Sequence, residues 1–456
     1  MPAKRKRKTK IPKLPAGLER VQLNAAAIDI GAREHYVAVP PERAAEPVRR
    51  FGAHTAALHA LAAWLKECGV TTVAMESTSN YWVALFQILE RAGFEVVLCN
   101  SRHVKNLPGR KTDVADCQWL QELHTYGLLS GSFRPSDEVC VLRSYLRHRD
   151  NLVKAAGSHI QQMQKALTEM NIALHHAVSD ITGVSGLAII RAMLAGERDV
   201  QKLAALKDRR VKKSVAEIAL ALEGDWRSEH LFALRQSFEL YETYLARIAE
   251  CDREIEATLG GLEHKGEPLG QEKALRSPKA QATFALKSEL HAICGVDLTA
   301  LPGLEVLSVQ ALVSEIGLDM TRWRSERAFC SWLRLCPGNR ISGGKSARLK
   351  PVQGHNRAAD ILRLCAQSAL KSKSALGAFG RRLRARLDAP KAIKAVAHKL
   401  ARLIYRMLKE GRPYAELGEH YYQHKYRQRL LTRLHKQAAL FGFQLTPQPG
   451  SIGSVS

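Results

Sequence analysis

The sequence has no apolar run long enough to cross a membrane and no apolar segment near its start of the kind that directs secretion. Its nine cysteines are scattered and odd in number, without a C-x-x-C pair, so neither a disulfide framework nor a zinc site is indicated. We therefore expect a cytoplasmic protein that does not contact a membrane.

Two common catalytic motifs are also missing. The chain has no G-x-x-x-x-G-K-[ST] phosphate loop, because the segment Ser342-Gly343-Gly344-Lys345 lacks the required spacing. It also has no H-E-x-x-H pair for binding zinc. The sequence therefore gives no support for ATP hydrolysis.

Acidic residues are scarce relative to basic ones. The 456 residues include 69 Lys and Arg against 44 Asp and Glu, a formal net charge of +25. Such an excess favours binding to polyanions through phosphate neutralisation, so nucleic acid is the first candidate partner and a nucleoid-associated location is expected. A ribosome-associated or merely basic protein is the alternative. The length allows two or three domains, and the 46% hydrophobic content is typical of folded proteins.

The first part of the chain predicts an α/β domain. Residues 1–20 are basic and without periodicity, and we expect a disordered arm along nucleic acid phosphates or a solubilising tail. Apolar runs bounded by glycines and polar turns follow over residues 21–135. They predict strands over 25–31, 35–39, 47–51, 71–76 and 95–99, and helices over 55–68, 81–92 and from about 113.

Four acidic residues fall at the ends of these predicted elements. Asp29 lies near the end of the first strand and Glu76 ends the fourth, while Asp113 and Asp116 open a helix and share one face of it. Ligands gather at strand ends in open α/β sheets, and converging carboxylates require divalent cations. Two such ions suit phosphodiester exchange. Alternatively, Asp113 and Asp116 only stabilise a helix N-terminus.

Basic residues beside these acids, and others later in the chain, suggest contacts with phosphates. Arg110 and Lys111 directly precede the acidic helix, and we expect them to meet a phosphate-bearing substrate. Further candidates for binding nucleic acid lie in the last third of the chain, namely Gly303, Arg340, Lys345, Arg348, Lys350 and Arg357. A solvated helix face is the simpler interpretation of such charges.

The rest of the chain predicts helices. Apolar residues recur at helical spacing over residues 136–260, which indicates a long helical connector with packing or oligomer seams. A polar linker over 261–290, a C-terminal domain over 291–445 and a disordered tail over 446–456 are expected to follow. Residues 301–305 and the apolar helix after them resemble a helix-hairpin-helix, in which Gly303 would let backbone amides hold a DNA phosphate.

Ser342 lies in a segment rich in glycine and cations. An exposed, flexible loop of this kind could carry a nucleophile, with Arg340 and Lys345 steadying the charge on phosphorus. By composition alone, an ordinary polar loop is favoured.

The motifs together resemble one family. Asp29, Glu76 and the acids of G-R-K-T-D-V-A-D, followed by Leu128-Leu129 and Pro135, resemble the RuvC-like, RNase-H-fold domain of the DEDD-type insertion-sequence transposases, relatives of the Piv DNA invertases. The resemblance implies that the four acids bind Mg²⁺ and act on DNA. It also implies a coiled-coil connector, and a serine nucleophile in a P-x-x-x-x-S-G context, which here is Ser342. Some relatives are guided by a non-coding bridge RNA.

The main hypothesis is therefore an insertion-sequence transposase, a DNA recombinase with a composite site of Mg²⁺-binding acids and Ser342. Its expected partners are donor and target DNA and further copies of the chain in a dimer or tetramer. The resemblance adds a guide RNA as a candidate partner. One alternative is a Holliday-junction type endonuclease that uses the acids and water. The other is a non-catalytic nucleic-acid-binding protein.

Overall fold

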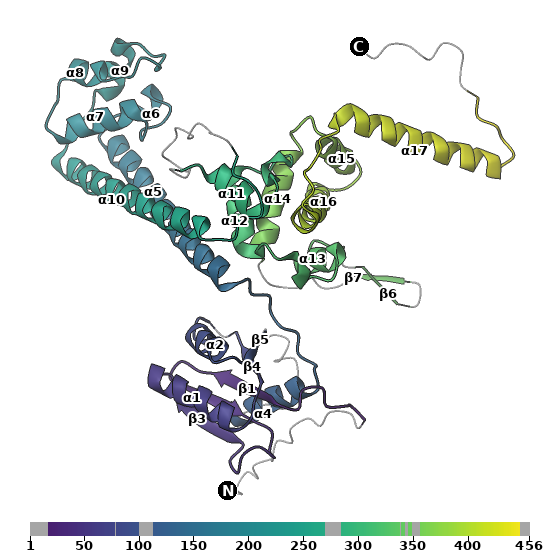
Figure 1. Cartoon of the computed structure of the whole chain (residues 1–456). Coiled ribbons are helices and arrows are strands. Elements are labelled where there is room, and N and C mark those ends of the chain that lie inside the picture. The colour runs from purple at the N-terminus through teal and green to yellow at the C-terminus, as the bar shows by residue number, and fades with distance from the viewer. Residues whose placement is uncertain are drawn as a thin grey trace, which may run out of the picture. The chain divides into compact units, whose positions relative to one another are not determined.

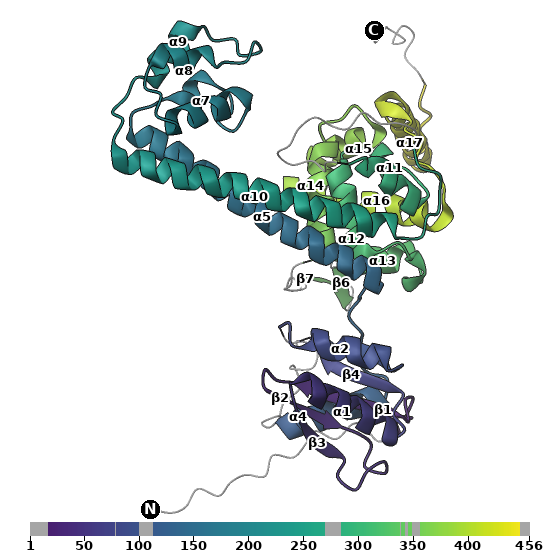
Figure 2. The ribbon, with the colours of Figure 1, turned by 60° about the vertical axis from the view of Figure 1, so that its left-hand side comes forward.

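The computed structural model describes residues 17–77, 79–99, 113–269, 284–337, 339–342, 345–348 and 356–446. The chain divides into two compact units, Met1–Arg134 and Pro135–Ser456, and each is described by itself (Figures 1 and 2). Most of the predicted N-terminal arm and nearly all of the predicted tail lie outside the described residues, as do Arg110, Lys111 and Lys350. No helix among the described residues is long and apolar enough to cross a membrane.

The first unit is built on a five-stranded mixed sheet with the order β3-β2-β1-β4-β5. The middle strand β1 pairs antiparallel with β2 and parallel with β4, and β4 pairs parallel with β5. All five predicted strands are present, with ends that differ from the prediction by one residue at most. The strands are β1 (Ala25–Ile30), β2 (Glu34–Ala38), β3 (Val48–Gly52), β4 (Thr72–Glu76) and β5 (Glu95–Cys99).

Helices cover both faces of this sheet. α1 (Thr55–Glu67) and α2 (Trp82–Arg91) pack on one face over Ile28 and Met75. α4 (Asp113–Thr125) packs on the other face, where Trp119, Leu120 and Leu123 meet Ala27 and Ala74. Small alanines on this face let the helix lie close to the strands, which matters for the acids at its start.

Two long antiparallel helices begin the second unit (Figures 1 and 2). They are α5 (Asp137–Glu169) and α10 (Ser228–Gly260). Arg149 bonds to Asp252 at one level of the pair, and the Ser237 hydroxyl donates to Gln162 at another, which fixes the opposite directions. Short helices follow α5, namely α6 (Leu174–Ala177), α7 (Val184–Leu194), α8 (Val200–Ala205) and α9 (Val215–Leu222). The prediction that residues 136–260 are mainly helical is thus confirmed.

The helical stretch at the start of this region is interrupted once. The apolar pattern predicts a helical stretch over about 139–177, and in the structure this stretch is divided between α5, which ends at Glu169, and α6, which ends at Ala177. Asn171 then adopts a left-handed conformation with φ of 56°, which a helix cannot continue through. Asparagine tolerates this conformation better than most residues.

The remainder of the second unit is mainly helical. It contains α11 (Leu286–Cys294), α12 (Val306–Ile316), α13 (Glu326–Trp332), α14 (Arg357–Ala369), α15 (Ala375–Arg384), α16 (Ala389–Glu410) and α17 (Gly418–Leu440), with 3-10 turns at Leu298–Ala300 and Met320–Arg322. Trp323, Phe329 and Tyr405 form an aromatic cluster in its core. The predicted fold class, an α/β domain followed by a mainly helical region, is confirmed at this level.

The prediction of a loop around Ser342 is partly wrong. Its backbone forms a two-stranded antiparallel ribbon of β6 (Asn339–Ser342) and β7 (Lys345–Arg348). Short polar strands of this kind carry no apolar alternation, so the pattern used for the other strands could not find them.

Candidate active site

Asp29 and Glu76 lie at the same level on neighbouring parallel strands. Ala27 pairs with Ala74 and Ile28 with Met75, so Asp29 and Glu76 come next in the same register. Adjacent strands lie about 4.8 Å apart. Because side chains alternate along a strand, both carboxylates point to the face that Ala27 and Ala74 present to α4. The sheet therefore brings two of the predicted acids together.

The start of α4 lies at the same edge of the sheet. The Cys117 thiol donates to the carbonyl of Ala27 at 3.5 Å, and Gln121 Nε2 donates to the carbonyl of Ala25 at 3.1 Å. The helix therefore runs back along β1 from its carboxyl end. One helical turn spans about 5.4 Å and two strand residues about 6.6 Å, so the first turn of α4 lies beside Asp29.

The charges of Asp29 and Asp116 both affect the Cys117 thiol. Burial raises the pKa of the Cys117 thiol well above its usual value, and the negative charges of Asp29 and Asp116 raise it further. Cys117 directly follows Asp116, and its hydrogen bond to Ala27 brings the start of α4 close to Asp29. Asp116 is half-buried, whereas Asp113, at the first position of the helix, is exposed.

The position of Glu76 is fixed by the neighbouring strand β5. Glu76 pairs with Cys99 in the sheet, and the residue is only 7% exposed. Burial and the charge of Glu76 raise the pKa of the Cys99 thiol to about 12. The Ser77 amide and hydroxyl both donate to the Cys99 carbonyl, at 3.0 and 3.1 Å, and fix the chain directly after Glu76.

The side chains at this edge of the sheet are chemically suitable ligands for a magnesium ion. Carboxylate oxygens are hard ligands of the kind Mg²⁺ prefers, and no softer ligand is needed. Within the described part of the chain, however, no three acidic, histidine or cysteine side chains already converge tightly enough to hold a metal. An ion bound here would therefore have to draw the carboxylates together.

Ser342 lies in the second unit, at the end of β6. Its backbone partner across the ribbon is Lys345, and Arg340 pairs with Ala347. Arg348 ends the other strand, opposite Asn339. The ribbon thus carries several of the predicted residues within a few positions of the serine.

Gly303 and Arg357 also have packing roles. A Cβ atom on Gly303 would lie 2.3 Å from the Cys365 carbonyl oxygen, and the residue has a φ of 85°. Arg357 pairs with Asp150 of α5 at 2.9 Å and with Glu315 of α12 at 3.7 Å. Gly303 therefore lets its loop lie close to α14, and Arg357 links α14 to α5 and α12.

A sheet that presents acids at neighbouring strand ends, followed by a basic helical region, is the arrangement expected of an enzyme that cuts nucleic acids. Comparison with protein families agrees. Residues 26–172 match the model for IS110-type DEDD transposases, described as transposase, and residues 297–381 match the model described as transposase IS116/IS110/IS902 family. The chain belongs to the IS110 family of insertion-sequence transposases, and it is a DNA-cleaving and rejoining enzyme of transposition. No curated protein matches it.

The two matched ranges contain the predicted reactive residues. All four acids fall in the first range and Ser342 in the second, while α16 and α17 lie beyond both. Sequence reasoning missed Cys117, the buried residue that ties the acidic helix to β1. Its position directly after Asp116 on the inward side of the helix was the available signal.

Proposed function

We propose that this transposase exchanges DNA strands at a composite site made of Asp29, Glu76, Asp113, Asp116 and Ser342. The observation that carries the acidic half is the shared register of Asp29 and Glu76 beside the first turn of α4. Bound Mg²⁺ would supply charge neutralisation at the scissile phosphate and the leaving oxygen. The strand order, with β1 antiparallel to β2 and parallel to β4, supports a RuvC-like assignment of this domain.

The serine supplies the nucleophile in this proposal. Ser342 Oγ forms a bond to phosphorus while the bond from phosphorus to a deoxyribose oxygen breaks. The hydroxyl proton is released, and the departing oxygen takes up a proton. A hydroxyl of the second strand later reverses these steps, so the number of phosphodiester bonds is conserved. The absence of a phosphate loop in the sequence agrees with a reaction that needs no ATP.

The basic excess and the long helices support the proposed partners. A net charge of +25 suits a protein that holds donor and target DNA, and it also suits a bridge RNA. Exchange between two duplexes requires more than one protomer, and the outer faces of α5 and α10 offer long surfaces for a dimer or tetramer. Sequencing RNA that co-purifies with the protein tests the guide, and a lack of any enriched species would remove that part.

Trapping a covalent protein–DNA adduct tests the chemistry. The wild-type protein with Mg²⁺ and cognate DNA should give an adduct that survives denaturation, and Ser342→Ala should give none. Ser346→Ala is the matched control, because Ser346 lies on the other strand of the same ribbon. Equal cleavage by wild type and Ser342→Ala would show instead a nuclease that uses water.

The acids are tested separately from the serine. Glu76→Gln and Asp116→Asn should lose cleavage while DNA binding is retained, since removing one carboxylate weakens the cation site without reducing positive charge. Retained cleavage in both variants would remove the acids from the mechanism. No cleavage by the wild-type protein on any cognate DNA, with binding intact, would favour a non-catalytic role.

A further inference from the structure

A groove between α15, α16 and α17 is lined by basic residues and tyrosines. It has a volume of about 1000 Å³ and 18 lining residues, of which six are Arg or Lys and four are Tyr. Within the part of the chain that the structure describes, no Asp or Glu lines it. All residues of the groove from Arg382 onward lie beyond both matched family ranges.

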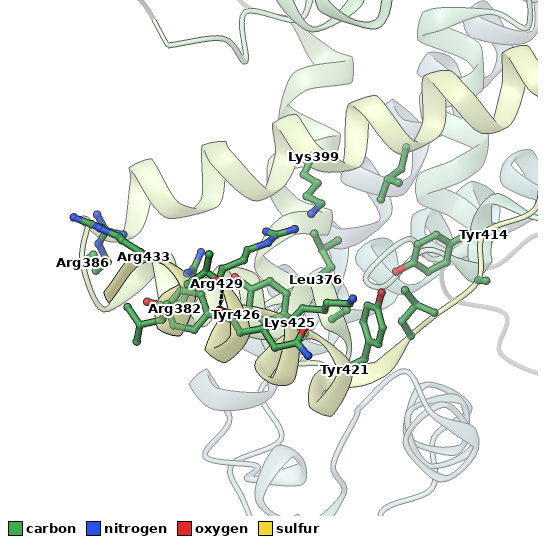
Figure 3. A pocket seen from close by; sticks show the side chains of 18 residues that line it. Leu376, Arg382, Arg386, Lys399, Tyr414, Tyr421, Lys425, Tyr426, Arg429 and Arg433 are labelled. Carbon is green, nitrogen blue, oxygen red and sulfur yellow. Dashed lines mark hydrogen bonds between the residues drawn. The ribbon is translucent and has the colours of Figure 1, made fainter. Parts of the chain in front are cut away.

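The positive charges come from three separate helices. Figure 3 shows Arg382 from α15, Arg386 from the turn directly after α15, Lys399 from α16 and Arg429 from α17 around the same space. Partial desolvation lowers the pKa of Lys399, and the charges of Arg402 and Arg429 lower it further. Cations gathered in this way repel one another, so a bound polyanion would relieve the repulsion.

The tyrosines add a second kind of contact. Arg382 lies over the rings of Tyr426 and Tyr422, at 3.9 and 5.5 Å from their centroids, and Lys425 lies over Tyr421 at 5.7 Å. Tyr421 remains 44% exposed at the groove. Aromatic rings interleaved with cations are the platform on which unpaired bases stack in proteins that bind single strands.

The groove is a built part of the fold rather than a gap beside a loose helix. The first half of α17 is fixed to α15 by an ion pair of 2.8 Å between Arg381 and Glu419. Phe379 meets Tyr422 edge to face, with ring centroids 6.2 Å apart. The side of α17 that carries Tyr421, Lys425 and Arg429 is therefore held in place facing the groove.

We propose that this groove binds a single-stranded segment of nucleic acid, with phosphates on the basic residues and one or more bases stacked on the tyrosines. A volume near 1000 Å³ is on the scale of a small-ligand site and does not suit a whole duplex. An acidic protein segment would satisfy the cations but would leave the tyrosines unexplained. The proposal does not rest on the acid and serine chemistry, because binding alone tests it.

The test measures binding of the full chain to labelled 12-residue oligonucleotides by fluorescence anisotropy. Single-stranded DNA, single-stranded RNA and duplex DNA of one sequence are compared, so that the two possible sources of a single strand are separated. Lys425→Gln/Arg429→Gln should weaken single-strand binding at least ten-fold and flatten its salt dependence. Arg427→Gln/Lys436→Gln is the matched control, with the same charge change on the same helix but outside the groove.

Tyrosine variants separate stacking from charge. Tyr421→Ala should weaken single-strand binding about ten-fold, while Tyr421→Phe keeps the ring and should bind like wild type. Duplex binding should change by less than about two-fold in both variants, because paired bases do not stack on the groove. Circular dichroism checks that helix content is unchanged.

Three results would overturn the proposal. One is an equal loss of single-strand binding in the groove variant and its control. Another is wild-type affinity in Tyr421→Ala. The last is competition by polyglutamate as strong as that by an oligonucleotide of equal charge, which would assign the groove to an acidic protein partner.

Discussion

Arg149 and Asp252 form a two-point ion pair between the long antiparallel helices of the second unit. Arg149 Nε and Nη2 lie 2.5 and 3.2 Å from the two carboxylate oxygens, and the side chains are only 9% and 3% exposed. Removing one partner would leave a buried charge without compensation. The pair therefore matters more for stability than the exposed ion pairs of the same helices.

We expect Asp252→Ala to lower the free energy of unfolding of the helix pair by about 3–5 kcal/mol. Glu250→Ala should cost less than about 1 kcal/mol, because its ion pair with Arg247 on the same helix is exposed. Hydrogen exchange of the α5 and α10 amides measures both. The double variant Arg149→Met/Asp252→Leu should recover most of the loss, and a failure to recover would mean that packing rather than charge explains the cost.

The first unit should lose stability as pH falls below neutral. Burial lowers the pKa of His124 to about 4, and its Nε2 lies 2.9 Å from the Thr72 hydroxyl. The unfolded chain, with a histidine pKa near 6.5, binds a proton that the folded chain excludes between about pH 6.5 and 4. Stability present at pH 7 is therefore lost over that window, up to about 3 kcal/mol from this residue.

Urea unfolding of the full chain at several pH values, followed in first-unit peptides by hydrogen exchange, measures this loss. His124→Gln should reduce the slope between pH 6.5 and 4, and the control His59→Gln should not, because His59 is exposed. Burial also lowers the pKa of His35, so part of the slope should remain in His124→Gln. An unchanged slope would contradict the assignment.

The acidic edge of the sheet should respond to metal even without DNA. Because like charges repel, Asp29→Asn should raise the melting temperature of the first unit in EDTA. Mg²⁺ or Mn²⁺ should raise it in the wild type by binding the folded state, and should have little effect on Asp29→Asn. Glu95→Gln is the control, since Glu95 lies at the opposite end of β5. Equal metal responses in all three proteins would place the ions elsewhere.

Gly303 should be intolerant of any side chain for reasons of packing. Gly303→Ala combines a left-handed φ with a clash against the Cys365 carbonyl, and we expect a loss of about 2–4 kcal/mol. Gly411→Ala is the matched control, because Gly411 has a φ of 66° but no atom within 4 Å of the added Cβ. Its cost should be about 1–2 kcal/mol. Thermal unfolding compares them, and equal costs would show that the clash with α14 is relieved.

The strands β1, β4 and β5 of the first unit could be predicted because they consist mainly of apolar residues and are bounded by glycines or polar turns. The same regularity placed Asp29 and Glu76 at strand ends, where the register brings them level. The break after α5 could not be predicted, because the apolar periodicity continues past Asn171 and only its backbone conformation ends the helix.

The groove shows a different limit of the sequence. Tyr421, Lys425 and Arg429 lie on one helix, and the sequence of this helix shows by itself only a run rich in basic residues. The tyrosines acquire meaning when α15 and α16 bring Arg382 and Lys399 to the same space, which is a tertiary association without a local pattern. The two strands around Ser342 are mostly polar and show no alternation of apolar and polar residues, so their sequence resembles that of a loop.

Among the residues that the structure describes, the ribbon that carries Ser342 consists of two strands. Hairpins of this size are marginally stable in water unless something supports them. In the proposed mechanism, we therefore expect the Ser342 hydroxyl to be positioned fully only once substrate or a neighbouring protomer contacts the ribbon. A solitary copy of the enzyme would then cut DNA poorly, and wasteful breakage before both recombination partners are present would be rare.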